Sequence, residues 1–147
     1  MTDAPSHSYR LAQALDRIVR RLNGRMIHVM PAVDRLKLGP LGGMVLLSIA
    51  DLEPCSIQSL CSQLGRDNSQ MTRVLRGLED KGVIRRQSDP EDRRSSLISL
   101  TELGQDLVAE MRLAMSAVVD ELASAISAGE RADLADLLER LAEAGKA

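Results

Sequence analysis

The side chains best suited to chemistry lie between residues 66 and 94, where eight basic residues stand among six acidic ones. Inside this segment, apolar residues at 71, 74, 75 and 78 recur in steps of three and four, which predicts a helix with one buried face. The opposite face would carry short polar and basic side chains, namely Asn68, Ser69, Gln70, Thr72, Arg73 and Arg76. A helix with such a face fits the major groove of double-stranded DNA, where base edges offer donors and acceptors.

Each of these side-chain types matches a particular feature of DNA. Arginine binds a guanine edge through two parallel hydrogen bonds, so Arg73 is the candidate for that contact. Gln70 or Asn68 suits an adenine edge. Ser69 or Thr72 suits a phosphate or a thymine methyl group.

A change of period follows this helix. Apolar and β-branched residues at 83–84, the Asp-Pro turn signal at 89–90 and the apolar return at 97–100 predict a two-stranded hairpin with a charged tip. A shorter helix over 57–64 precedes the polar one across a glycine turn. Two helices followed by a hairpin are the arrangement of a winged helix-turn-helix.

The hairpin adds further candidate DNA contacts. Arg85 and Arg86 on its first arm would bring positive charge towards phosphates. At the tip, the Asp92 carboxylate is close enough in sequence to hold the Arg94 guanidinium in one orientation, which suits a narrow A·T-rich minor groove. Arg93 beside it is the natural phosphate contact, although the two arginines could exchange these roles.

Long apolar stripes flank this unit. Apolar residues keep helical spacing over 11–36, 103–126 and 134–141, and Pro31 predicts a kink between residues 27 and 31 of the first stripe. The stripes offer more apolar surface than a small DNA-reading unit can bury, so a symmetric homodimer is expected. The expected N-caps of the later helices are Ser56, Asp67 or Asn68, Thr101 and Ser127.

The predicted fold is mainly α with a small β-hairpin wing. Its 147 residues suit a single domain, 1–147. Within it we expect a winged helix-turn-helix DNA-binding region at 38–100, flanked by long N- and C-terminal dimerisation helices at 1–37 and 101–147.

The wing carries a recognisable motif. The run Asp89-Pro90-Glu91-Asp92-Arg93-Arg94, followed by Leu97, Leu100-Thr101 and Gly104, resembles the wing signature of the multiple antibiotic resistance regulator (MarR) family. The preceding helix-turn-helix is similar to that of the family at Ile57, Leu60, Leu64, Thr72, Arg73, Leu75, Leu78, Gly82, Val83 and Arg86. The order and lengths of the helices agree over nearly the whole chain, and the wing run is the specific part.

The resemblance implies a homodimeric, DNA-binding transcriptional regulator, usually a repressor that a small molecule or an oxidant releases. In such proteins the first and last helices of both subunits form the dimer, and the winged domains bind a pseudo-palindrome. Peroxide-sensing members place a reactive cysteine in the first long helix, and this sequence has none there.

Residues that could sense a signal are few. Cys55 precedes a short helix, whose N-terminal dipole could lower the pKa of a thiol, so a redox role is an alternative to the default of two reduced thiols. Arg17 and Arg21 belong to a basic ridge that either is solvated or holds an anionic effector such as an aromatic carboxylate. His7 and His28 lack ligand spacing, so no metal and no cofactor are expected.

Other classes of protein fit the sequence less well. No catalytic triad, phosphate-binding loop or metal cluster is visible, which argues against an enzyme. No apolar run is long enough for a membrane span and the N-terminus lacks a signal peptide, so a cytoplasmic location is expected. The alternative is a winged-helix module that binds another protein and no operator; the basic face disfavours it.

Overall fold

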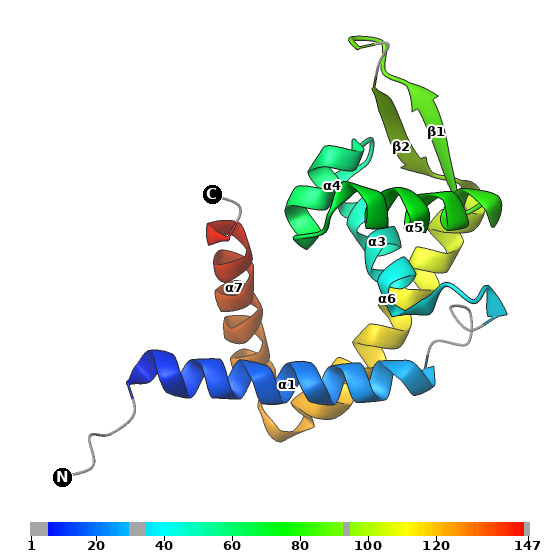
Figure 1. Ribbon diagram of the computed structural model, residues 1–147. Helices are drawn as coiled ribbons and strands as arrows, with labels where there is room; N and C mark the ends of the chain where they lie inside the picture. Colours follow the sequence, from blue (N-terminus) through cyan, green and yellow to red (C-terminus); the bar gives the residue numbers. More distant parts are fainter. Residues whose placement is uncertain (1–5, 30–34, 93–94, 146–147) are drawn as a thin grey trace.

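The protein is mainly helical, with one antiparallel hairpin. The computed structural model describes residues 6–29, 35–92 and 95–145 (Figure 1). Its elements follow in the order α1 (His7–Val29), α3 (Gly39–Leu52), α4 (Ile57–Leu64), α5 (Asn68–Asp80), β1 (Ile84–Ser88), β2 (Ser96–Leu100), α6 (Glu102–Leu122), the 3-10 turn η1 (Ala123–Ala125) and α7 (Ala128–Ala144). The expected fold class, mainly α with a hairpin wing, is confirmed.

Side-chain caps start the helices from α4 onwards. A side-chain oxygen before each helix accepts a hydrogen bond from a backbone N–H of the first turn, which satisfies a donor without a partner inside the helix. The pairs are Ser56 with Ser59, Asp67 with Gln70, Thr101 with Gly104 and Ser127 with Glu130. The expected caps are therefore confirmed, and Asp67 rather than Asn68 is the cap of α5.

A tight turn joins α4 to α5. Gly65 ends α4 in the left-handed conformation, with φ of 59°, which a glycine adopts without a steric cost. The N–H of Arg66 donates to the carbonyl of Cys61 at 3.1 Å, so a helix carbonyl at the end of α4 is satisfied. The turn sets α5 across α4 and leaves one long side of α5 free (Figure 1).

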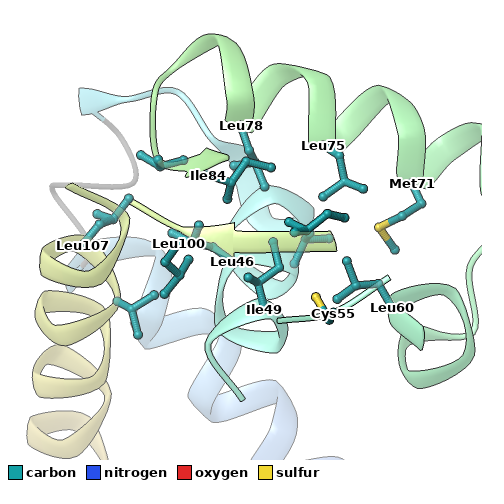
Figure 2. Close-up of a cluster of buried hydrophobic side chains, with 14 of the residues drawn as sticks. Leu46, Ile49, Cys55, Leu60, Met71, Leu75, Leu78, Ile84, Leu100 and Leu107 are labelled. Carbon is teal, nitrogen blue, oxygen red and sulfur yellow. The ribbon is translucent and has the colours of Figure 1, made fainter. Parts of the chain in front are cut away.

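One apolar core lies between α3, α4, α5, the hairpin and the first half of α6. Figure 2 shows Leu46 and Ile49 of α3 close to Leu75 of α5, with Leu60 of α4 beside them. These four side chains have no exposed surface. Burying a leucine or isoleucine contributes about 1.5–3 kcal/mol, so this core fixes α5 firmly on its support.

The hairpin is attached to the core by its inner face. Ile84 pairs with Leu100 and Arg86 pairs with Ile98 in the antiparallel register. On the other side of β2, Cys55 and Ile98 exchange both backbone hydrogen bonds, at 3.0 and 2.7 Å. The backbone at Cys55 therefore forms a single antiparallel β-bridge with β2 near the base of the wing.

A close contact joins the wing to α6. The hydroxyl of Thr101 donates to the carbonyl of Gly82 at 2.6 Å, and the N–H of Thr101 donates to the carbonyl of Val83 at 3.1 Å. One turn later, a Cβ on Gly104 would lie 2.0 Å from the Val83 carbonyl oxygen. Only glycine permits this approach, so α6 leaves the wing in one direction.

The flanking helices bury little of their apolar surface. In α1, Leu11, Leu15 and Ile18 are 41–50% exposed. In α7, Leu134, Leu137, Leu138 and Leu141 are 45–53% exposed, and Figure 1 shows α7 standing apart from the winged unit. Within one chain, these stripes lack the cover that apolar helix faces ordinarily have.

The predicted kink falls at the edge of what the structure describes. Helix α1 continues past Gly24 to Val29. Pro31 lies outside the described residues, so the kink between residues 27 and 31 stays a prediction.

Replacing Gly104 by alanine should destabilise the fold, because the new methyl group would collide with a backbone carbonyl that cannot rotate away. We expect Gly104→Ala to lower the free energy of unfolding by about 3 kcal/mol, measured by urea denaturation at a fixed protein concentration. Gly77→Ala is the matched control, since no atom lies within 4 Å of its added Cβ. That change should raise stability by up to about 1 kcal/mol through helix propensity; equal effects at both positions would contradict the contact.

Candidate nucleic-acid interface

Helix α5 presents one polar and basic face to solvent. The structure places Asn68, Ser69, Gln70, Arg73 and Arg76 at exposed positions and Thr72 at a half-buried one. The first turn is oriented by Asp67, whose Oδ1 accepts a hydrogen bond from the Gln70 N–H at 2.8 Å. The side chains predicted to read DNA are thus brought together on one side of one helix.

The opposite side of α5 is buried. Met71, Leu75 and Leu78 are at most 2% exposed, and Val74 is half-buried. Figure 2 shows the three buried side chains on one side of α5, directed towards α3 and β2. A polar face on a firmly packed helix loses little conformational entropy on binding, because its backbone is already ordered.

One further basic residue lies in the turn just before this helix and was not predicted as a site residue. Arg66 is exposed in the turn that precedes the Asp67 cap. A basic residue at that position adds positive charge beside the N-terminus of α5, where the helix dipole already favours anions. The pattern that could have revealed it is the basic residue next to a helix cap.

The wing tip is held by an aspartate. Asp89 Oδ1 accepts from the Glu91 N–H at 2.9 Å, and its Oδ2 accepts from the Ser95 hydroxyl at 3.0 Å. The Ser95 N–H also donates to the Asp92 carbonyl at 2.9 Å. These bonds close the turn that the sequence predicts, and they lower the pKa of Asp89, mainly through the Glu91 N–H.

Arg93 and Arg94 lie outside the described residues, so their contacts and the orienting role of Asp92 towards Arg94 stay predictions. The Asp92 residue itself is exposed.

Arg86 differs from its predicted role. Its Nε atom is buried and lies 3.1 Å from Glu79 Oε2 at the end of α5, and its side chain is 24% exposed. The N–H is not aligned for a hydrogen bond, so the contact is an ion pair. Arg86 is therefore not a free phosphate-binding charge; alternation along β1 gives the exposed position to Arg85 instead.

The prediction for Cys55 was wrong about the direction of the pKa. Burial, followed by the nearby Glu53 carboxylate, raises the pKa of the Cys55 thiol to about 11. The core around it disfavours the thiolate more than the following helix N-terminus favours it. A redox role for Cys55 thus loses its chemical basis.

The remaining candidate residues lie away from α5. Arg17 and Arg21 are exposed on α1, whose Arg25 pairs with Glu121 at the far end of α6 from the wing. Among the described residues, no group of three or more His, Cys, Asp or Glu side chains is placed to hold a metal ion. Across the same residues, no helix is both long and apolar enough to cross a membrane.

A helix pair, a hairpin packed beside it and a polar, basic face on the second helix define a winged helix-turn-helix protein. The family model of the MarR family matches residues 43–96, which span most of α3 to the start of β2. This segment is therefore similar to the MarR family, and the chain has the fold of MarR-family transcriptional regulators.

Solved structures agree with this assignment over nearly the whole chain. A MarR transcriptional regulator from Methanosarcina mazei Go1 is 26% identical with a TM-score of 0.75, over 92% of this chain and 95% of that one. Wild-type MarR from E. coli in its apo form is 26% identical with a TM-score of 0.66, over 86% and 95%. A MarR-family transcriptional regulator from Rhodococcus sp. RHA1, 24% identical, shares the fold with a TM-score of 0.73 over 95% and 96%.

Removing the Asp89 carboxylate should loosen the wing tip and leave the core intact. We expect Asp89→Ala to raise the hydrogen-exchange rates of the Glu91 and Ser95 amides, with those of α5 unchanged. Because the pKa of Asp89 is lowered, its contribution is complete above the ordinary value of 3.8 and is lost only as the pH falls through the lower folded value. If the exchange rates of these two tip amides change neither with the substitution nor with acidification, Asp89 does not have this role.

Proposed function

We propose that the protein is a homodimeric transcriptional regulator that binds double-stranded DNA in a sequence-specific manner. In this proposal α5 enters the major groove, and the wing reaches an adjacent minor groove. The observation that carries the proposal is the polar and basic face of α5, which is exposed although the rest of that helix is packed into the core.

The side chains of α5 are assigned roles by their chemistry. Arg73 would bind a guanine edge, and Gln70 or Asn68 an adenine edge. Arg76 and the half-buried Thr72 would bind phosphates, which set position rather than sequence preference. Asp92, Arg93 and Arg94 would act at the wing tip, an assignment that rests on the resemblance of the wing run to the family signature.

The homodimer is supported by the apolar surface of the end helices. The stripes of α1 and α7 are about half exposed in one chain. Covering each leucine would contribute of the order of 1 kcal/mol, since half of the full burial energy remains available. A second copy related by a two-fold axis would cover both stripes. The same axis would present one α5 helix to each half of a pseudo-palindrome.

The proposal also covers the effect of DNA binding on transcription and how that binding is released. Repression with release by a small ligand follows the family pattern. The proposed ligand is an anionic aromatic molecule, for which Arg17 and Arg21 supply exposed guanidinium groups on α1. A cytoplasmic location is proposed with it, because the target DNA is there.

Selection of duplexes from a random library should enrich a pseudo-palindrome, whose affinity falls steeply with salt. Arg73→Ala should then weaken binding to the selected site by about 1–3 kcal/mol and alter the preferred bases. Arg20→Ala is the control, because it removes the same charge from α1, where Arg20 pairs with Asp16.

An equal loss on every sequence would make Arg73 a phosphate contact only. If selection enriches nothing over background, DNA reading is wrong, and a winged module that binds another protein becomes the better explanation.

The dimer can be tested on α7. Sedimentation should give twice the 16.0 kDa mass of the chain, and Leu137→Asp combined with Leu141→Asp should give a monomer with unchanged helix content in the winged unit. Asp136→Asn is the control, because Asp136 lies on the opposite face of α7 from the leucine stripe. A wild-type monomer at micromolar concentration would contradict the interface.

A further inference from the structure

The Arg86–Glu79 ion pair connects two parts of the proposed DNA-binding surface. Arg86 is the third residue of β1, and Glu79 is the last but one residue of α5. Their contact, Nε to Oε2 at 3.1 Å, therefore lies beyond the backbone connection between the two elements. That connection is short and begins with the Gly82 N–H bonded to the Glu79 carbonyl.

The surroundings of this pair make it more than a surface contact. Arg86 faces inwards on the hairpin, opposite Ile98, and its side chain is 24% exposed. Glu79 is 43% exposed and sits in the last turn of α5, where the helix dipole disfavours a carboxylate. The guanidinium offsets that repulsion, and partial burial reduces the screening of the pair by salt.

Arg85 provides a contrast within the same strand. It carries the same charge one residue earlier, but alternation along β1 turns it outwards and leaves it exposed. Within the described part of the chain, no ion pair involves Arg85. Arg85 is therefore an exposed basic charge on the wing, whereas the charge of Arg86 is held in an ion pair with α5.

We infer that Arg86 is a positioning residue for DNA binding: through Glu79 it fixes the angle between the wing and α5, and it does not bind phosphate. Two elements that enter neighbouring grooves must keep one relative orientation, because a mobile wing would have to be ordered each time DNA binds, which costs conformational entropy. The inference rests on the proposed function and names the residues that hold its two reading elements together.

Operator binding distinguishes positioning from phosphate contact. The full chain is titrated with the selected duplex at several salt concentrations, for Glu79→Gln, Arg86→Gln and the double variant. We expect each single change to weaken binding about 5-fold, the double variant to be no weaker than either single, and the salt slope to be unchanged. Arg85→Gln is the comparison, because it removes the same charge from an exposed position on the wing; any loss of affinity there should come with a lower salt slope, unlike the loss for Arg86→Gln.

The opposite pattern would overturn the inference. If Arg86 bound phosphate, Arg86→Gln would lower the salt slope by about one, and Glu79→Gln would leave binding unchanged or strengthen it by removing a negative charge. Two single variants with wild-type affinity would also overturn it. So would an Arg86→Gln loss accompanied by the same fall in salt slope as that of Arg85→Gln, since the effect would then be one of charge.

A measurement without DNA keeps this test independent of the proposed function. Residual dipolar couplings of the backbone amides should fit one alignment frame for α5 and the hairpin in the wild type and in Arg85→Gln. They should require two frames in Glu79→Gln. One shared frame in Glu79→Gln would overturn the positioning role, whereas failure of the duplex selection would overturn only the DNA-binding proposal.

Discussion

The backbone of α6 passes so close to the base of the wing that a Cβ on Gly104 would lie 2.0 Å from the Val83 carbonyl oxygen. Thr101 uses its hydroxyl and its N–H on the carbonyls of Gly82 and Val83 in the same place. Because three short contacts act on two neighbouring carbonyls, the wing and α6 have little freedom to bend against each other. Helix α6 thereby becomes a rigid extension of the hairpin.

Helix α6 connects this joint to the helices at the other end of the molecule. α6 spans 21 residues, about 31 Å, and contacts α1 near its far end, where Arg25 pairs with Glu121. Closer to the wing, Arg112 holds α3 through Asp51 at 2.7 Å. Because α6 is tied to the wing at one end and to α1 at the other, any displacement of α1 against α6 would act on the wing through a packed helix.

Local rules predicted the helices and their caps well, because they depend on residues three or four positions apart. The buried face of α5, the Ser56, Thr101 and Ser127 caps and the Asp89-Pro90 turn were all predicted in this way. Local rules failed at Arg86 and Cys55. Glu79 contacts Arg86 only once β1 folds back beside α5, and Cys55 is buried in a core that includes Ile98, more than forty residues away in the sequence.

The sequence by itself determined which elements form, which face of each is apolar, and which family's wing motif the chain resembles, since periodicity, caps and the wing run are encoded within short windows. Only the tertiary structure decided which of two adjacent arginines is free, in which direction the Cys55 pKa moves, and why Gly104 must lack a side chain. Each of these depends on atoms of another element: Glu79 of α5 beside Arg86, the packed core around Cys55, and the Val83 carbonyl beside Gly104. Ion pairing, burial and steric contact arise only when the elements pack together, so the spacing of residues along the chain does not specify them.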